Sequence, residues 1–343
     1  MKRTELSELG EFGLIDKLTE NFPIRHSSTI KGIGDDAAVL SETSNQRLVS
    51  TDLLIEGVHF DLMYTPLKHL GYKAAIVNFS DIAAMNGTPK QMTVSLAVSN
   101  RFSLEALKEL YSGIQAACDR YNVDLVGGDT TSSNSGMFIS ITIIGEAPKE
   151  EVVYRSTVNE KDLLCVTGDL GGAYMGLMLL EREKKVFQES PGVQPDLSGF
   201  DYVLGRQLRP EARVDIIKKL KEAGIMPTGM IDISDGLASE ALHLANDSGL
   251  GVNIYEDKIP IHPMTFDVSE QFKLVPSITA LNGGEDYELL FSIKQEDYEK
   301  ITKLDDISVI GHFTDKSFGY NLITNDNTSI PLNAQGWDHY KEK

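Results

Sequence analysis

Acidic side chains recur in this sequence beside glycines, beside hydroxyl side chains and at the ends of apolar segments. The segments concerned are Gly32-Ile33-Gly34-Asp35-Asp36, Ser50-Thr51-Asp52, Gly127-Gly128-Asp129-Thr130 and Asp232-Ile233-Ser234-Asp235-Gly236. Carboxylate and hydroxyl oxygens are hard ligands that suit Mg²⁺. Two carboxylates about 4 Å apart repel by roughly 1–4 kcal/mol, so a cluster of them requires cations. If these segments converge in the fold, the chemistry that they indicate is the binding of divalent metal ions.

Most of these segments also have a purely structural interpretation. Gly32 and Gly34 permit a tight turn, after which Asp36 would lie on a surface strand. Asp232 would cap the helix that follows it, and Asp235 would lie in the positive first turn of that helix. Capping and metal binding are compatible, but for the last two residues taken alone we favour capping.

Asp81 lies within AAIVNFSDIAAM, a segment of small and apolar residues that is predicted to be helical. Aspartate is unfavourable in a helix interior, and a charge on a buried apolar face must be paired or bind a metal. We therefore interpret Asp81 as functional. With it, the candidate metal ligands by residue type and position are Asp36, Asp52, Asp129, Asp232 and Asp235.

The charge and composition of the chain exclude several classes of partner. A formal net charge of −19 argues against nucleic acid, which requires clustered basic residues. A chain this acidic binds a polyphosphate only where arginine, lysine or bound metal reverses the local charge. The sequence has no apolar run long enough for a membrane span and no secretory signal. We therefore expect a cytoplasmic protein, with Cys118 and Cys165 as reduced core residues.

Other motifs give weaker indications. Residues 168–172 precede a helix and could present backbone amides to a phosphate, although a tight turn is the interpretation that we favour. Residues 283–288 form another loop of glycines and acids. Trp337 would stack on an aromatic ligand or hold the C-terminal tail in place. The sequence contains no P-loop, no protein-kinase motifs and no HExxH zinc motif.

The elements that must position these residues alternate between strand and helix, which predicts an α/β fold. The first half has predicted strands at 47–60, 91–98, 123–127 and 137–146, and predicted helices at 66–86 and 103–121. The second half has predicted strands at 163–168, 229–233, 250–255, 286–293 and 307–312, predicted helices at 172–184, 211–223, 235–247 and 295–304, and a predicted loop at 188–202. Pro148 and the charged residues after it predict two domains, 1–149 and 150–343. The order of the strands is not predicted.

Seven motifs identify the family that the sequence resembles. In chain order they are GIGDDAAV, STDLLIEGVHF, NFSDIAAMNG, GGDTT, DISDGL, GGEDYEL and GWDH. This set resembles the thiamine-monophosphate kinase family, which belongs to the superfamily of aminoimidazole ribonucleotide synthetase and selenophosphate synthetase. The resemblance implies an aminoimidazole ribonucleotide synthetase-like fold with an N-terminal α/β domain, whose sheet pairs with its twin in a homodimer, and a C-terminal α/β domain. It also implies that ATP and several Mg²⁺ ions bind in the cleft between the domains.

Matching motif positions imply roles for individual residues. The implied metal ligands are Asp36, Ser50 or Thr51, Asp52, Asp81, Asp129, Asp232 and Asp235. The implied ATP contacts are Tyr111, Gly128, Asp129, Arg155 and Ser234. The implied contacts of thiamine phosphate are His59, Glu285 and Trp337, and the implied catalytic residues are Asp81, Asp129 and Arg155. The sequence departs from the family pattern at Asn86, where glycine is usual, and at Ser132 and Ser133, where an arginine is common.

The reaction that the resemblance implies is the ATP-dependent phosphorylation of thiamine monophosphate to thiamine diphosphate. The acceptor is a phosphate monoester with a second pKa of roughly 6, so it needs no general base near pH 7. Mg²⁺ held by the aspartates would bring the two polyanions together for in-line transfer, with Arg155 adding positive charge. The alternatives are an ATP-dependent synthetase of the same superfamily and a non-catalytic Mg²⁺- or Ca²⁺-binding protein. A selenide-using enzyme would want a reactive cysteine near the N-terminus, and the first cysteine here is Cys118.

Overall fold

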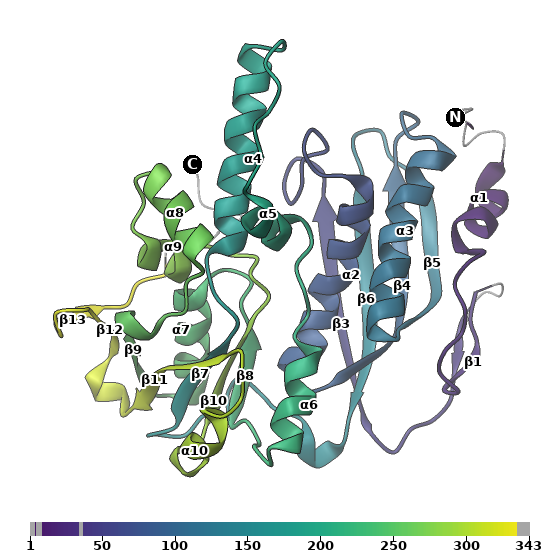
Figure 1. The fold of residues 1–343 in the computed structure, drawn as a ribbon. Helices are drawn as coiled ribbons and strands as arrows, with labels where there is room; N and C mark the ends of the chain where they lie inside the picture. The colour runs from purple at the N-terminus through teal and green to yellow at the C-terminus, as the bar shows by residue number, and fades with distance from the viewer. Residues whose placement is uncertain (1–3, 5–8, 34–36, 335–343) are drawn as a thin grey trace. The chain divides into compact units, whose positions relative to one another are not determined.

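The computed structural model describes residues 4, 9–33 and 37–334, and the chain divides into two compact units. The first unit comprises Met1–Ile82 and Gly87–Glu150, and the second comprises Ala83–Asn86 and Glu151–Lys343. Figure 1 shows the helices and strands of each unit. The short segment 83–86 groups with the second unit because its alanines pack in that unit's core.

A four-stranded sheet forms the centre of the first unit. Its strands lie in the order β3 (Gln46–Ile55), β6 (Phe138–Ala147), β4 (Thr88–Val98) and β5 (Asp124–Ser132). β4 and β5 run parallel, and the other neighbouring pairs run antiparallel. The remaining elements of this unit's N-terminal part are α1 (Gly10–Thr19), β1 (Thr29–Lys31) and β2 (Val39–Leu40).

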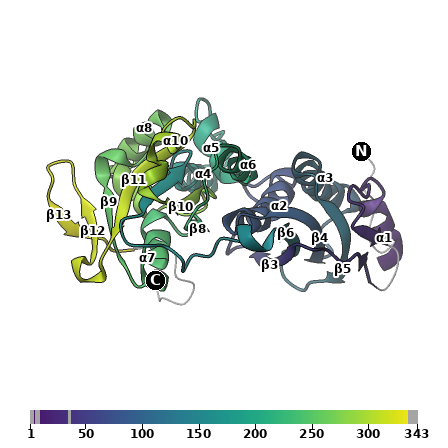
Figure 2. The same cartoon turned by 90° about the horizontal axis from the view of Figure 1, so that it is seen from below.

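Two long helices, α2 (Leu67–Ala84) and α3 (Leu104–Tyr121), cover one face of this sheet (Figure 2). They approach each other at glycines, where the absence of a side chain lets the backbones touch. A Cβ atom on Gly113 would lie only 1.8 Å from the carbonyl oxygen of Lys68. Gly71 makes the corresponding close approach from α2 to α3.

The other face of the four-stranded sheet is largely open to solvent. Side chains alternate between the two faces along each strand, so Val49 and Leu53 of β3 point away from the helices. Their side chains are 67% and 51% exposed. Ser95 of β4 and Asp129 of β5 are also exposed on this side. Two large apolar side chains this exposed on one sheet face are a candidate for an interaction surface.

The second unit is built on a seven-stranded mixed sheet. In spatial order its strands are β13 (Ser329–Pro331), β12 (Tyr320–Ile323), β9 (Gly251–Tyr255), β11 (Ile307–Thr314), β7 (Leu163–Thr167), β10 (Leu289–Ile293) and β8 (Gly229–Asp232). Only the β12–β9 pair is parallel. The helices are α4 (Gly172–Glu189), α5 (Asp201–Leu208), α6 (Val214–Glu222), α7 (Leu237–Ser248), α8 (Pro263–Gln271), α9 (Pro276–Asn282) and α10 (Tyr298–Ile301).

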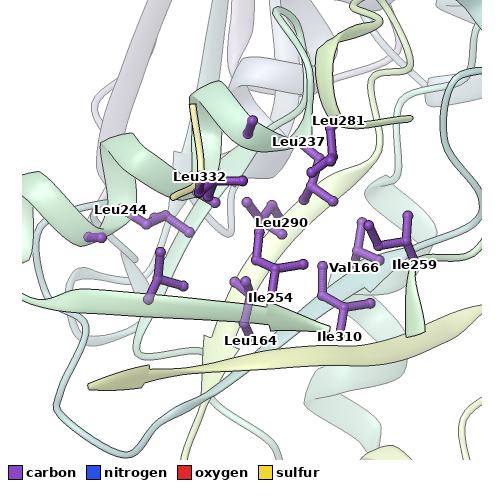
Figure 3. Packing of buried hydrophobic residues seen from close by; sticks show 14 of the residues in the cluster. Leu164, Val166, Leu237, Leu244, Ile254, Ile259, Leu281, Leu290, Ile310 and Leu332 are labelled. Atoms are coloured by element: carbon purple, nitrogen blue, oxygen red, sulfur yellow. The ribbon is translucent and has the colours of Figure 1, made fainter. Parts of the chain in front are cut away.

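Both faces of the central strands in this sheet are buried. Leu164 and Val166 of β7 pack with Leu237 and other residues of α7, as Figure 3 shows. Cys165, between them on the strand, points to the opposite face and packs with Ile216 of α6. A strand buried on both sides reads as a continuous apolar run in the sequence, which explains why it was readily predicted.

Cys118 on α3 and Cys165 on β7 are buried free thiols, as the sequence predicted. Burial raises the pKa of Cys118 to about 12. Within the described ranges, every helix is too short or too polar to cross a bilayer.

Most predicted elements are present with shifted ends, but some predictions were wrong. The strand predicted at 123–127 continues to Ser132, because its pairing with β4 runs on through the glycines. The loop predicted at 188–202 is shorter, since α4 extends to Glu189 and α5 begins at Asp201. The helix predicted at 295–304 contains only a 3-10 turn and the four-residue α10. Several short elements were missed, among them α8 and α9, which each begin at a proline.

Candidate active site

Ser50, Asp52 and Asp81 form a polar cluster between β3 and α2 in the first unit. The Ser50 hydroxyl donates a hydrogen bond of 2.5 Å to Asp81 Oδ2. The Asp52 amide donates one of 3.2 Å to Asn78 Oδ1, one turn earlier on α2. Ser50 and Asp52 are two residues apart on a strand, so both face the helix. The structure thus brings together two segments that are 31 positions apart in the sequence.

The cluster is electrostatically unfavourable without a cation. Burial, with repulsion from Asp81 as a second cause, raises the pKa of Asp52 to about 6. Burial also raises the pKa of Asp81, although the hydrogen bond from Ser50 opposes this shift. Both shifts mean that the environment disfavours the two negative charges. A positive ion beside the carboxylates would reverse this effect, so the site suits cation binding.

Asp129 lies on the opposite face of the sheet from Asp52. Cross-strand pairing through β6 and β4 places Asp52 in line with Gly128 on the face that the helices cover. Asp129 instead pairs with Ser95 on the open face. The cause is a bulge in the β4–β5 pairing, in which Val126 is an extra residue. One extra residue reverses which side chains face the helices. Within this unit, Asp129 therefore does not join the cluster.

Thr51 also points away from the cluster. Its hydroxyl donates a 3.0 Å hydrogen bond to the Ile141 carbonyl and accepts one from Thr142. Of the alternatives Ser50 and Thr51, it is Ser50 that shares a face with Asp52 and Asp81.

Tyr111 and His59 have defined surroundings in the first unit. Tyr111 is buried on α3, packs edge-on against Phe22 with ring centroids 6.2 Å apart, and has its pKa raised to about 12 by burial. His59 follows β3, and its Nδ1 accepts a 3.0 Å hydrogen bond from the Ile55 amide. The proton of the neutral imidazole is therefore on Nε2, which makes this nitrogen a donor suited to an anion.

In the second unit, residues 232–236 connect β8 to α7. Asp232 is buried at the end of β8, and Ser234 is exposed. The N-cap of α7 is Gly236, which has no side chain and has a φ of 115°. Asp232 and Asp235 both precede this residue, so the prediction that Asp232 is the N-cap, with Asp235 inside the first turn, is wrong.

Glu240 of α7 joins this segment, and the sequence analysis missed it. Its Oε1 accepts hydrogen bonds of 3.0 Å from the Asp235 amide and 3.5 Å from the Ser234 hydroxyl. Burial raises the pKa of Glu240 to about 8, and the charges of Asp235 and Asp232 act in the same direction. In the sequence it is only an acidic residue in the first turn of a helix, which is common and gives no signal of function.

The loop of residues 283–288 is fastened to the segment that follows β8. The Glu285 amide donates a 2.7 Å hydrogen bond to the Ser234 carbonyl, and the Tyr287 amide donates one of 2.9 Å to the Ile233 carbonyl. Glu285 and Tyr287 have positive φ angles of 66° and 52°. Such conformations are uncommon outside glycine and persist where the surroundings enforce them, often at functional sites. Glu285, Ser234 and Asp235 are thus brought together.

The Asp286 carboxylate accepts hydrogen bonds from the backbone amides at the start of α4. These bonds are 2.6 Å long from the Gly171 amide and 3.2 Å long from the Ala173 amide. Residues 168–172 form the tight turn that the sequence favoured, with a φ of 81° at Gly171. These amides bind a carboxylate of the protein itself and not a phosphate.

A buried network supports the 283–288 loop, and the sequence analysis missed this too. Arg206 donates a 2.7 Å hydrogen bond to Glu288 Oε1, and Arg213 donates one of 2.5 Å to Glu288 Oε2. Gln207 donates one of 2.9 Å to Glu285 Oε2. Arg206 and Gln207 lie on α5, in a stretch where no element was predicted, so nothing indicated that their side chains would be buried.

Arg155 also lies outside these clusters. The Arg155 side chain is 57% exposed, and its guanidinium lies 2.7 Å from the Asp247 carboxylate of the same unit. Asp36 and Trp337 lie outside the described residues.

Comparison with known proteins defines first the class of fold and then the family. Residues 34–147 match the family model of the AIR synthase related protein N-terminal domain, and residues 160–320 match that of the C-terminal domain. The predicted fold class is confirmed. The chain is 36% identical to the thiamine-monophosphate kinase of Bacillus subtilis strain 168, over 97% of this chain and 100% of that protein. The chain belongs to the thiamine-monophosphate kinase family and is a phosphotransferase, as predicted.

Solved structures support the same assignment. AaThiL complexed with AMPPCP and TMP is 32% identical, with a TM-score of 0.73, over 99% of this chain and 100% of that chain. Thiamine-monophosphate kinase from Stenotrophomonas maltophilia K279a is 28% identical, with a TM-score of 0.78, over 92% of this chain and 97% of that chain.

Proposed function

We propose that this chain transfers the γ-phosphate of ATP to thiamine monophosphate and so produces thiamine diphosphate. Membership of the thiamine-monophosphate kinase family supports this proposal, as does the likeness to AaThiL, which was solved with AMPPCP and TMP. The structural observation that carries it is the cluster of Ser50, Asp52 and Asp81, in which two carboxylates have raised pKa values. A pair of this kind is costly in a core that serves packing alone, and it suits a site that handles cations and polyanions.

The cluster fits Mg²⁺, which the family implies. Ser50, Asp52 and Asp81 would supply hard oxygen ligands from the first unit. Among the described residues, no group of three or more His, Cys, Asp or Glu side chains is arranged to hold a metal ion. Water and phosphate oxygens would complete the coordination, as is usual for this ion. When bound, Mg²⁺ would neutralise phosphate charge and stabilise the charge that develops during transfer.

The second unit offers a further set of oxygen ligands. Asp232 and Asp235 lie close enough to Glu240 to raise its pKa, although burial is the larger cause. Within the described part of the chain, Glu240 Oε2 is buried and has no hydrogen-bond partner. A cation held by Asp232 and Asp235 would relieve this concentration of carboxylates. The other ligands that the family implies are Asp36, Thr51 and Asp129.

The remaining residues of the chain would orient the two substrates. The acceptor phosphate is largely deprotonated near neutral pH, because its second pKa is roughly 6, so no side chain is needed as a general base. His59 presents an N–H donor that suits a phosphate oxygen. Arg155 would add positive charge, and Trp337 would stack on a thiamine ring. Tyr111, Gly128, Asp129 and Ser234 would contact ATP, and Glu285 would contact thiamine phosphate.

We also propose that two copies of the chain associate through the open face of the four-stranded sheet. Val49 and Leu53 leave apolar area on this face, and Thr51 and Ser95 lie beside them. Pairing of two such faces would bury these side chains in a sheet-on-sheet contact. The face carries Asp129 as well, so association would also bring that residue close to the partner's sheet.

The decisive experiment is a coupled measurement of both products. The purified protein is incubated with ATP, MgCl₂ and thiamine monophosphate, and ADP and thiamine diphosphate are separated by chromatography. We expect equimolar formation of the two products and none after chelation of Mg²⁺. Release of ADP without thiamine diphosphate would contradict the proposal and favour a synthetase of the same superfamily. Absence of ADP would favour a metal-binding protein without catalytic activity.

A further inference from the structure

We propose that Gln207 is a positioning residue for Glu285, which it holds in the orientation that receives the cationic part of the thiamine substrate. This inference deepens the proposed function and rests on it. Gln207 Nε2 donates a 2.9 Å hydrogen bond to Glu285 Oε2, although the two residues are 78 positions apart. The Gln207 side chain is only 6% exposed, so this donor is almost entirely withdrawn from water.

The backbone of Glu285 is fixed, but this alone does not determine the rotamer of its side chain. The φ of 66° and the hydrogen bond from its amide to the Ser234 carbonyl set only the position of its Cα and Cβ atoms. A glutamate beyond that point has three rotatable bonds, and ordering such a long side chain has an entropic cost. A donor held in place by the fold would order the carboxylate before the substrate arrives, which is how preorganisation increases affinity.

The helix that carries Gln207 is itself held rigidly. Arg206, the preceding residue, donates hydrogen bonds of 2.7 Å to Glu288 Oε1 and 3.0 Å to the Asp169 carbonyl. α5 also packs directly on α4, where a Cβ atom on Gly176 would lie 2.1 Å from the Val203 carbonyl oxygen. Helix α5 therefore holds the side-chain amide of Gln207 in a fixed position next to the 283–288 loop.

The chemistry of the donor indicates which substrates the loop receives. Glutamine is neutral, so it orders the carboxylate of Glu285 and leaves its negative charge in place. An arginine or lysine at this position would cancel that charge. The fold uses Arg206 for the neighbouring acids Asp286 and Glu288, and the neutral Gln207 for Glu285. This distribution suits a ligand whose ring system carries positive charge, as thiamine does.

The test compares Michaelis constants for the two substrates in the full-length enzyme. Gln207→Leu keeps a similar volume and removes the donor. We expect the KM for thiamine monophosphate to rise about ten-fold, the effect typical of losing one hydrogen bond to a charged group. The KM for ATP should stay within about two-fold of its normal value, since a local change acts on one substrate. Gln188→Leu, the same substitution at an exposed position of α4, is the matched control and should change neither constant.

A double-mutant cycle separates positioning from general damage. In a Glu285→Ala background, Gln207→Leu should change the KM for thiamine monophosphate by less than about two-fold, because the group that it positions is gone. A full ten-fold effect in that background, or a rise in the KM for ATP equal to that for thiamine monophosphate, would overturn the inference.

A crystal structure of the Gln207→Leu protein tests the geometry independently of activity. The Glu285 carboxylate should occupy a new rotamer or several rotamers while residues 283–288 keep their backbone path. An unmoved carboxylate would overturn the inference even if the kinase activity is present. Conversely, if the unmodified protein does not phosphorylate thiamine monophosphate, the proposed function fails and the structural test still decides the role of Gln207.

Discussion

At the scale of single residues, the functional candidates are recognisable by their unfavourable surroundings. Asp52 and Asp81 are carboxylates in a half-buried place that raises the pKa of each. Asp81 was identified from the sequence because aspartate is out of place on an apolar helix. Glu240 is just as unfavourably placed but was not identified, because an acid in the first turn of a helix is ordinary.

Substituting Asp81 should reduce activity and leave the fold intact or more stable. Asp81→Asn removes a charge that repels Asp52, so we expect the melting temperature in the presence of EDTA to be unchanged or higher. Formation of thiamine diphosphate should fall by at least about 100-fold, because Asp81 would help to hold the Mg²⁺ that neutralises charge on the transferring phosphate. Differential scanning fluorimetry and the product assay measure the two effects. Unchanged activity of this variant would contradict the assignment of the cluster.

Glu288 provides a contrasting case, in which a buried charge serves stability. It accepts hydrogen bonds from Arg206, Arg213 and Thr167 and is 1% exposed. Glu288→Gln leaves both guanidinium groups with an incomplete set of acceptors, so the free energy of unfolding should fall by about 3 kcal/mol. Glu299→Gln, at an exposed position of α10, should change it by no more than about 0.5 kcal/mol. Denaturation in urea measures both, and equal values for the two variants would refute this role.

At the scale of elements, glycines determine how closely the backbones approach. Gly113 lets α3 touch α2, and Gly128 lets β5 pair with β4, where a Cβ atom would lie 2.0 Å from the Val94 carbonyl oxygen. In contrast, a Cβ atom on the neighbouring Gly127 would meet nothing closer than 3.6 Å. The requirement for glycine is therefore set by the packing partner and not by the local sequence.

Two alanine substitutions in helices should have opposite effects. Gly113→Ala forces α2 and α3 apart, and we expect a loss of about 1–3 kcal/mol in the free energy of unfolding. Gly205→Ala, within α5, places its Cβ atom where no other element of the structure comes within 4 Å. It should gain up to about 1 kcal/mol, because alanine favours the helix. Urea denaturation of both variants measures the difference, and a stabilised Gly113→Ala protein would show that the close helix contact is not required.

At the scale of the whole molecule, each unit has a sheet of different character. The seven-stranded sheet is buried on both faces around its centre, and its core is complete within the unit. The four-stranded sheet has one face covered by α2 and α3 and the other exposed. The open face carries the exposed apolar side chains of Val49 and Leu53 among polar ones, which is why we propose that a second copy covers it.

A charge on the open face should prevent this association. Leu53→Glu would bury a carboxylate without a partner if the faces met, so we expect the variant to be monomeric where the normal chain is dimeric. Phe318→Glu, at a position 70% exposed on the second unit, is the matched control and should leave the dimer intact. Size-exclusion chromatography with light scattering measures the mass. A dimeric Leu53→Glu protein would exclude this face as the interface.

The sequence alone was sufficient for the properties that local patterns encode. Strand and helix periodicity predicted the main elements, and seven ordered motifs predicted the family, because both signals lie in short stretches of chain. Asp81 stood out as a candidate from one residue and its helical neighbours.

Only the tertiary structure decided relationships that depend on pairing across long distances in the chain. A bulge at Val126 sets the face on which Asp129 lies, and one residue more or less in the β4–β5 register would have placed Asp129 on the same face of the sheet as Asp52. In the same way, Glu285 meets Gln207 because α5 packs near the loop, and neither segment carries a signal of that contact. Local propensity specifies what a segment becomes, whereas the neighbour of each side chain is fixed when distant segments pack together.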